Sequence, residues 1–131
     1  MNYQEAIDVL FTKLPMFQRS GPAAYKANLD GTKAVCSMLG NPENDLKFVH
    51  IAGTNGKGST AHMLKSILIE SGLKIGLYTS PHLKDLRERI KINGEMISKK
   101  DVVSFVKENK KKFEKIDLSF FEFMVALSFD Y

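Results

Sequence analysis

Gly53-Thr54-Asn55-Gly56-Lys57-Gly58-Ser59-Thr60 is the stretch of this sequence that decides the fold. The residues before it, KFVHIA at 47–52, are mostly apolar and partly β-branched, and they predict a short buried strand. After it, apolar side chains recur at helical spacing over residues 59–71, and Gly72 follows as a stop signal. The stretch is therefore predicted to be a glycine-rich turn that connects a strand to a helix.

A turn of this kind is suited to hold phosphate groups. The amino end of a helix presents unpaired N–H groups and a partial positive charge, and glycines let the backbone approach an anion closely. Lys57 adds a mobile positive charge for β- and γ-phosphates, and nearby hydroxyl groups can reach a bound magnesium ion. The alternative, a tight turn with an incidental lysine, is disfavoured by this combination of residues and context.

Two common phosphate-binding patterns do not match. In the general pattern G-x-x-x-x-G-K-[ST], Ile51 stands at the first glycine position and Gly58 at the hydroxyl position, so this is a variant loop. The dinucleotide fingerprint also fails, because the next predicted strand ends in Tyr78-Thr79-Ser80 without an acid for the ribose. A nicotinamide or flavin enzyme is therefore disfavoured.

The rest of the chain predicts an α/β fold. A strand at 74–78 would lie parallel to the strand at 47–52, with a right-handed crossover through the helix between them. Asn93-Gly94 predicts a hairpin between strands at 89–92 and 95–97. Residues 15–23 and 79–88 are expected to be loops, and further helices are predicted at 3–13, from Tyr25 or Thr32 to Leu39, at 99–113 and at 119–131.

Composition places the chain among ordinary globular proteins. It has 131 residues, 44% hydrophobic and 26% charged, which fits one domain or part of one and excludes disorder and coiled coil. The formal net charge of +4 comes mainly from residues 84–91 and 107–115, and the run at 107–115 is expected to be a solvated helix face. The single cysteine, Cys36, indicates a reducing compartment, and the absence of a secretory or membrane-spanning segment predicts a cytoplasmic protein.

The end of the sequence predicts a piece of a larger domain. A helix at 119–131 that is apolar on nearly every face should be buried between other elements. Only two parallel strands are expected, whereas a doubly wound sheet usually has about five or six. Residues 1–131 are therefore expected to be the N-terminal part of a longer protein.

Four segments together resemble one known family: IAGTNGKGS at 51–59, GLYTSPHL at 76–83, RERI at 87–90 and FFEF at 120–123. They are similar to the folylpolyglutamate synthase / dihydrofolate synthase family, the folate branch of the Mur-ligase superfamily. The resemblance covers nearly all of this chain but about the first third of a typical member. It implies the start of a P-loop-type, mostly parallel sheet with flanking helices, the Mur-ligase ATPase domain, with the C-terminal domain absent.

The resemblance also implies an activity. Members of this family are ATP-dependent amide ligases that use Mg²⁺: they phosphorylate the carboxylate of dihydropteroate or of a folate, and the amine of L-glutamate then attacks the acyl phosphate. It implies a protein that is monomeric at full length and has no nucleic-acid or membrane partner. The other ligands of the family's metal and its C-terminal domain would lie beyond Tyr131, so this chain alone is expected to be inactive.

The family's site residues map onto this sequence as what the resemblance implies. Lys57 would be catalytic, balancing the charge of the transferring phosphoryl group, and Ser80 would ligate the metal, although a turn hydroxyl before Pro81 is the simpler interpretation of Ser80. His82 and Arg89 would contact substrate, with a salt bridge as the alternative for Arg89. The resemblance assigns a pterin site to Phe120, Phe121 and Glu122, although their spacing alone predicts that the phenylalanines are core residues. It assigns nucleotide binding to Thr54, Asn55, Gly56, Lys57, Gly58 and Ser59.

Two other functions stay open on the sequence. One is a different Mur-type ligase, which joins another carboxylate to another amine. The other is a basic module that binds nucleic acid through residues 84–91 and 107–115, and it leaves the glycine-rich turn unexplained. The remaining histidines carry less weight: His50 is expected in the core and His62 on a polar helix face.

Overall fold

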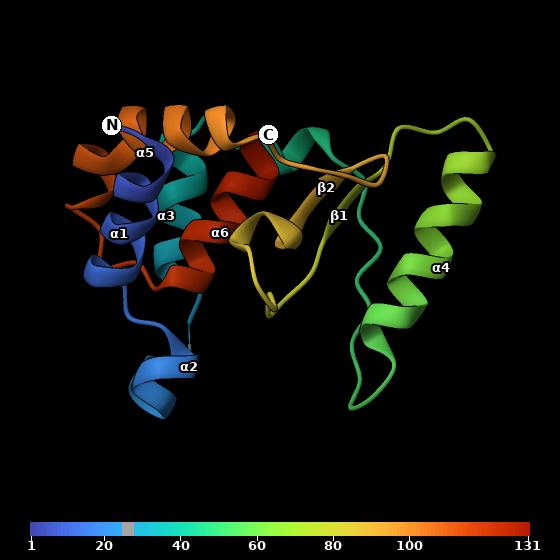
Figure 1. Cartoon of the computed structure of the whole chain (residues 1–131), viewed down its shortest axis with the longest axis horizontal. Coiled ribbons are helices and arrows are strands. Elements are labelled where there is room, and N and C mark those ends of the chain that lie inside the picture. Colours follow the sequence, from blue (N-terminus) through green and yellow to red (C-terminus); the bar gives the residue numbers. More distant parts are fainter. Residues whose placement is uncertain (25–27) are drawn as a thin grey trace. The chain divides into compact units, whose positions relative to one another are not determined.

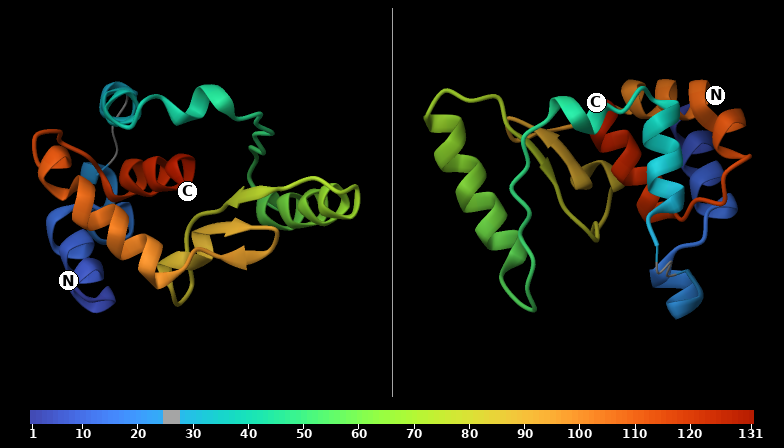
Figure 2. Two further views of the ribbon diagram at one scale, coloured as in Figure 1. Left: turned by 90° about the horizontal axis from the view of Figure 1, so that it is seen from above. Right: turned by 180° about the vertical axis from the view of Figure 1, so that it is seen from behind.

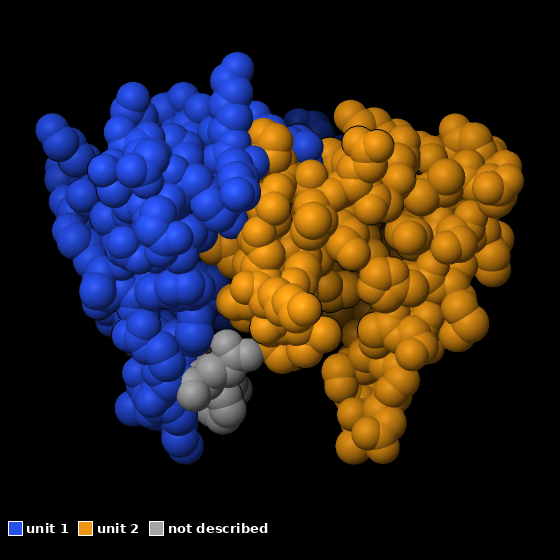
Figure 3. Space-filling view, in the orientation of Figure 1, with its two compact units in different colours: residues 1–45, 99–131 blue, residues 46–98 orange. Residues whose placement is uncertain are grey.

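The structure, a computed structural model, describes residues 1–24 and 28–131. It divides into two compact units, one formed by Met1–Asp45 with Lys99–Tyr131 and the other by Leu46–Ser98 (Figure 3). We call them unit 1 and unit 2. No described helix is long and apolar enough to span a membrane.

Unit 1 is helical (Figure 1). Helix α1 packs against α5, and α3 packs against α6 (Figure 2). Its elements are α1 (Tyr3–Lys13), α2 (Phe17–Ser20), the 3₁₀ turns η1 (Gly21–Ala24) and η2 (Pro42–Asp45), α3 (Asp30–Met38), α5 (Lys99–Phe113) and α6 (Phe120–Asp130).

Aromatic side chains form the centre of unit 1. The rings of Phe105, Phe113 and Phe123 meet pairwise, with centroids 5.5 to 5.8 Å apart. Phe120 lies 5.5 Å from Phe11, which joins α6 to α1. Most of the apolar side chains of α6 are buried, as the sequence predicts for a helix that is apolar on nearly every face.

The helix predictions for unit 1 are confirmed within a few residues. Helices α1 and α5 have the predicted bounds, and α3 ends before Gly40, whose φ of +85° is the left-handed conformation common after a helix. The possible start of α3 at Tyr25 falls outside the described residues. Residues 15–23 are not a plain loop, because two short helical turns, α2 and η1, begin within them.

Unit 2 contains α4 (Lys57–Glu70), the turn η3 (Leu86–Arg89) and a small antiparallel sheet. The sheet has the order β1-β2-β3, with β1 at Gly76–Tyr78, β2 at Ile90–Ile92 and β3 at Glu95–Met96. Gly76 pairs with Ile92 and Tyr78 with Ile90. Asn93 and Gly94 both have positive φ, 49° and 87°, so the predicted two-residue hairpin is confirmed.

The prediction of a strand at residues 47–52 is wrong. The segment has no strand structure, and Phe48 and Val49 are 57% and 70% exposed. A strand needs a neighbour for its N–H and C=O groups, and the sheet that the structure describes consists of β1, β2 and β3 alone. His50 is accordingly exposed rather than in the core, whereas His62 is exposed on α4 as expected.

The predicted parallel strand pair is also absent from the described residues. The strand after α4 pairs with β2 instead, and it does so antiparallel, because residues 79–89 reverse the chain between them. Helix α4 therefore carries no buried residue, and Met63 and Ile67 are 61% and 64% exposed.

Candidate phosphate-binding site

The glycine-rich turn leads directly into α4. Gly56 is the N-cap residue of this helix and has φ +76°, a left-handed conformation that costs a non-glycine residue about 1–2 kcal/mol. No side chain caps the helix from Gly56, so the first-turn N–H groups of α4 lack the usual capping acceptor. Residues 54–59 are all exposed to solvent. The turn thus presents positive backbone dipoles to an incoming anion.

The side chain of Lys57 folds back over this turn. Its Nζ donates hydrogen bonds to the carbonyl oxygens of Gly53, at 2.6 Å, and Thr54, at 3.2 Å. The ammonium group is thereby held over the same loop whose backbone N–H groups start the helix. A phosphate group that approached this end of α4 would meet both the dipole and the lysine charge.

A second part of unit 2 holds three of the residues implied by the family resemblance: Ser80, His82 and Arg89. Ser80 is exposed and precedes a cis peptide bond to Pro81. Arg89 is only 4% exposed, and its Nε donates to Nδ1 of His82 at 2.8 Å. The structure therefore joins His82 and Arg89 directly, and it gives the buried guanidinium a partner within the protein.

Burial and the charge of the Arg89 guanidinium shift the pKa values of two neighbouring groups, His82 and Tyr78. Burial lowers the pKa of His82, and the positive charge of Arg89 lowers it further. The pKa of Tyr78 is raised by burial, and the positive charge of Arg89 opposes that rise. His82 is therefore favoured in its neutral form.

Glu88 fixes the loop that contains Ser80 and His82, and it was not predicted as a site residue from the sequence. Its carboxylate accepts hydrogen bonds from the backbone N–H groups of Leu83, Lys84 and Asp85, at 2.8 to 3.0 Å. These bonds lower the pKa of Glu88 to about 2. The signal available in the sequence was the spacing Asp85-x-x-Glu88, since the two residues form a capping box around η3.

The described residues do not complete a metal site. Among them there is no group of three or more His, Cys, Asp or Glu side chains that could hold a metal ion. Ser80 offers a single neutral hydroxyl, whereas Mg²⁺ requires about six oxygen ligands, several of them usually water. The donor set of this chain therefore does not by itself fit a bound Mg²⁺.

The residues implied for the pterin site belong to unit 1 and differ in exposure. Phe120 is 2% exposed and packs in the core. The Glu122 carboxylate accepts from the N–H and Oγ of Ser119, both at 2.8 Å, and closes the capping box of α6. Phe121 is 52% exposed, so its ring is accessible for stacking.

The chain is similar to known proteins along its whole length, although no protein-family model matches it. It is 40% identical over 136 residues to a probable bifunctional folylpolyglutamate synthase/dihydropteroate synthase of Haloferax volcanii, and the aligned region covers 100% of this chain and 15% of that protein. It is 38% identical over 112 residues to dihydrofolate synthase/folylpolyglutamate synthase of Bacillus subtilis, covering 81% of this chain and 26% of the relative.

Solved structures show the same likeness. Folylpolyglutamate synthase from Thermotoga maritima matches with a TM-score of 0.83 and 38% identity, over 98% of this chain and 30% of that one. A folylpolyglutamate synthase in complex with AMPPCP and folate matches with a TM-score of 0.82 and 31% identity, over 100% of this chain and 32% of that one.

Fold and loop together define an α/β protein of the Mur-ligase fold. This confirms the predicted fold class, although the strands that the structure describes are antiparallel. The chain belongs to the folylpolyglutamate synthase / dihydrofolate synthase family. It spans between 15% and 32% of the lengths of the four proteins compared above.

Proposed function

We propose that this chain forms the nucleotide-phosphate-binding part of an ATP-dependent ligase that joins L-glutamate to dihydropteroate or to a folate. The observation that carries the proposal is the position of Lys57 over the uncapped amino end of α4. That arrangement fits a polyphosphate, because several backbone N–H groups and one ammonium group face the same exposed loop. The nucleotide-binding residues are Thr54, Asn55, Gly56, Lys57, Gly58 and Ser59.

The chemistry proposed for the whole enzyme needs such a site. A carboxylate is a poor acyl donor, so its oxygen first takes the γ-phosphoryl group of ATP, which gives an acyl phosphate and ADP. The amine of L-glutamate then forms the amide bond, and inorganic phosphate leaves. Lys57 and the N–H groups of α4 offset the negative charge that gathers as the two anions approach each other.

A magnesium ion would supply further charge neutralisation in this reaction. Ser80 is the residue of this chain that would contact it. The loop of Ser80 is held by Glu88, and Arg89 orients His82 within it. His82 is therefore the substrate-contacting residue of this pair, and Arg89 acts through it as a positioning residue.

The pterin ring is proposed to stack on Phe121. Its ring is the exposed one of the two neighbouring phenylalanines in FFEF, whereas Phe120 belongs to the core. Glu122 holds the first turn of α6 through Ser119 and thereby fixes where Phe121 stands. Phe120 and Glu122 thus contribute to the site by supporting the helix that carries Phe121.

Calorimetric titration of Mg-ATP into the chain tests the proposal. Lys57→Ala removes a charge-assisted contact to phosphate, so we expect at least about a tenfold loss of affinity. Lys65→Ala is the matched control, because it removes the same charge from the same helix about 12 Å further along. Equal affinities for the parent chain and both variants, or no binding by a chain that melts cooperatively, would contradict the proposal.

We also propose that the chain alone does not catalyse ligation. Its described residues supply one hydroxyl toward a metal and no complete metal site. Purified chain supplied with ATP, magnesium, dihydropteroate or folate, and labelled L-glutamate should therefore show no incorporation above the background without enzyme. Incorporation that Lys57→Ala abolishes would refute this part of the proposal and support the phosphate site.

A further inference from the structure

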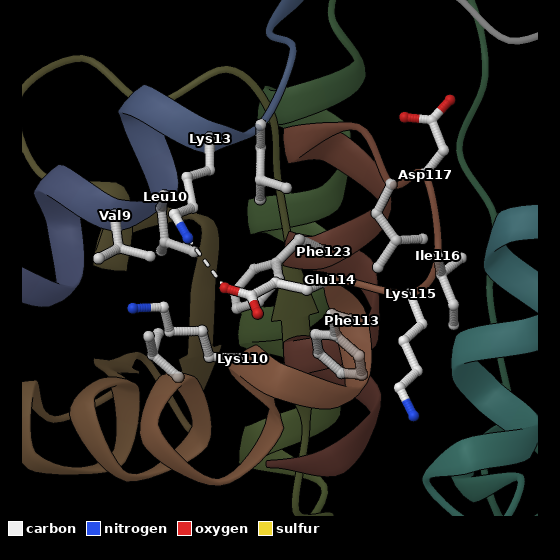
Figure 4. A pocket seen from close by; sticks show the side chains of 13 residues that line it. Val9, Leu10, Lys13, Lys110, Phe113, Glu114, Lys115, Ile116, Asp117 and Phe123 are labelled. Carbon is white, nitrogen blue, oxygen red and sulfur yellow. Dashed lines mark hydrogen bonds and ion pairs between the residues drawn. The ribbon is translucent and has the colours of Figure 1, made fainter.

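Unit 1 contains a cavity that has no part in the proposed ligase site. It has a volume of about 530 Å³ and lies among α1, the C-terminal end of α5 and the segment that connects α5 to α6 (Figure 4). A cavity of this size falls within the range of small-molecule sites, about 300–1,000 Å³. Phe121 does not line it, so it is distinct from the proposed pterin contact.

The inner wall of this cavity is apolar and firmly packed. Leu10, Val106 and Phe123 line it and are each at most 3% exposed. The ring of Phe123 is held by its edge contacts with Phe105 and Phe113, at 5.5 and 5.6 Å. These buried side chains form a packed floor, and the half-buried lining residues Val9, Leu14 and Ile116 present the apolar surface that an entering group can cover.

The rim of the cavity is charged. Lys13 and Glu114 form an ion pair at 2.8 Å, which Figure 4 shows reaching toward each other across the cavity. Lys110 of α5 lies four residues before Glu114, which follows the end of this helix, and lines the cavity as well. Lys115 adds a further positive charge to the lining.

The lysines make the rim a favourable place for a carboxylate. Glu114 already occupies this place, since its carboxylate lies 2.8 Å from Nζ of Lys13, and the hydrogen bond and charge of Lys13 lower its pKa. Lys110, Lys111 and Lys115 belong to the basic run at residues 107–115, a feature of the sequence that the proposed ligase function does not use.

We propose that this cavity binds a small amphipathic carboxylate. Its apolar chain would lie against Val9, Leu14 and Ile116, and its carboxylate would pair with Lys13 and Lys110 in competition with Glu114. The structure thus combines an apolar lining with a rim that carries three lysines against two acids, Glu114 and Asp117, and a net positive rim beside apolar surface is what such a ligand needs. The site lies entirely in unit 1 and does not depend on the phosphate loop of unit 2.

Octanoate is the probe that tests this proposal, with 1-octanol as its neutral counterpart. Titration of octanoate into the full chain should shift the backbone amide signals of cavity residues such as Ile116 and Leu118 in a saturable way, and leave those of unit 2 unchanged. Octanol should bind the same cavity more weakly, because it gains nothing from the lysines. No saturable shift at millimolar octanoate, or equal affinity for octanoate and octanol, would overturn the proposal.

Charge variants sharpen the test. Lys110→Ala should weaken octanoate binding about twofold to fivefold, as expected for a partly exposed ion pair, and leave octanol binding unchanged. Glu114→Gln should strengthen octanoate binding by a similar factor, because it removes the competing carboxylate. Lys107→Ala is the matched control, since this exposed lysine lies on the same helix and does not line the cavity.

A cavity-filling variant locates the binding. Val9→Trp places a large ring in the cavity and should abolish binding of both probes, while the circular dichroism melt of the chain stays cooperative. If Val9→Trp fails to fold, Lys110→Ala and Glu114→Gln still decide the question. Unchanged octanoate affinity in both charge variants would overturn the proposal.

Discussion

Two glycines of the phosphate loop should respond in opposite ways to the same substitution. Gly56 has φ +76° and precedes α4, whereas Gly58 lies inside the first turn of that helix. A Cβ atom at either position would meet no atom within 4 Å, so steric clashes do not separate the two substitutions. The difference must come from backbone conformation.

The backbone conformation sets the expected magnitudes. Gly56→Ala forces alanine into the left-handed region, which costs about 1–2 kcal/mol. Gly58→Ala replaces a poor helix former with the best one, which contributes up to about 1 kcal/mol of helix stability. The two variants should therefore differ by about 1–3 kcal/mol in the stability of α4.

Native-state amide hydrogen exchange of α4 measures this difference. Protection of the α4 amides should fall about fivefold to thirtyfold in Gly56→Ala and rise up to about fivefold in Gly58→Ala. The affinity for Mg-ATP should fall in Gly56→Ala, because the loop no longer holds its conformation. Equal changes of protection in both variants would refute the left-handed conformation assigned to Gly56 and the loop geometry built on it.

Three further predictions concern single side chains. The pKa of Glu88 is about 2 in the folded chain and 4.5 in its ordinary state, so the stability that Glu88 gives its loop should be fully present above pH 4.5 and lost as the pH falls toward 2. Amide exchange in that loop should therefore speed up as the pH falls through this window, and a constant rate would contradict the prediction. Burial and the neighbouring Glu43 carboxylate raise the pKa of the Cys36 thiol to about 11, so iodoacetamide at pH 8 should label Cys36 only after denaturation. Gly31→Ala should destabilise unit 1, because the new Cβ would lie 2.7 Å from Oε1 of Glu122. Such overpacking costs about 1–3 kcal/mol, whereas alanine adds at most about 1 kcal/mol of helix stability. A higher denaturation midpoint in the variant would contradict this prediction and show that the Glu122 side chain moves aside at little cost.

Much of the fold follows from local signals in the sequence. A two-residue hairpin turn requires two consecutive residues with positive φ, and Asn93-Gly94 adopts that conformation easily. Ser119 and Glu122 close a capping box that starts α6 one residue after the predicted position. Such features depend on residues close in the sequence, and they were predictable for that reason.

That residues 47–52 do not form a strand could not be predicted from local signals. Their apolar pattern indicates burial, but a strand also requires a partner that lies far away in the sequence. Phe48 and Val49 remain exposed where the described residues provide no such partner. The same reasoning explains why α4 has no buried residue, although its sequence has helical periodicity.

In the candidate site, too, local features were predictable from the sequence and contacts between separate residues were not. Lys57 and its glycines are recognisable because the chemistry of phosphate binding restricts residue types over eight consecutive positions. The contact of Arg89 with His82 spans seven residues, and Glu88 binds backbone groups, which any sequence provides. The structure was therefore needed to identify Arg89 as a positioning residue and to find Glu88.

The central claim is that the loop before α4 binds nucleotide phosphates. Its most direct test compares ATP with adenosine while the backbone amide signals of residues 54–59 are followed by NMR. The phosphate site predicts large saturable shifts with ATP in the parent chain, little shift with adenosine, and weakened ATP shifts in Lys57→Ala. Equal responses to ATP and adenosine, or ATP-dependent shifts confined to other residues, would contradict the claim.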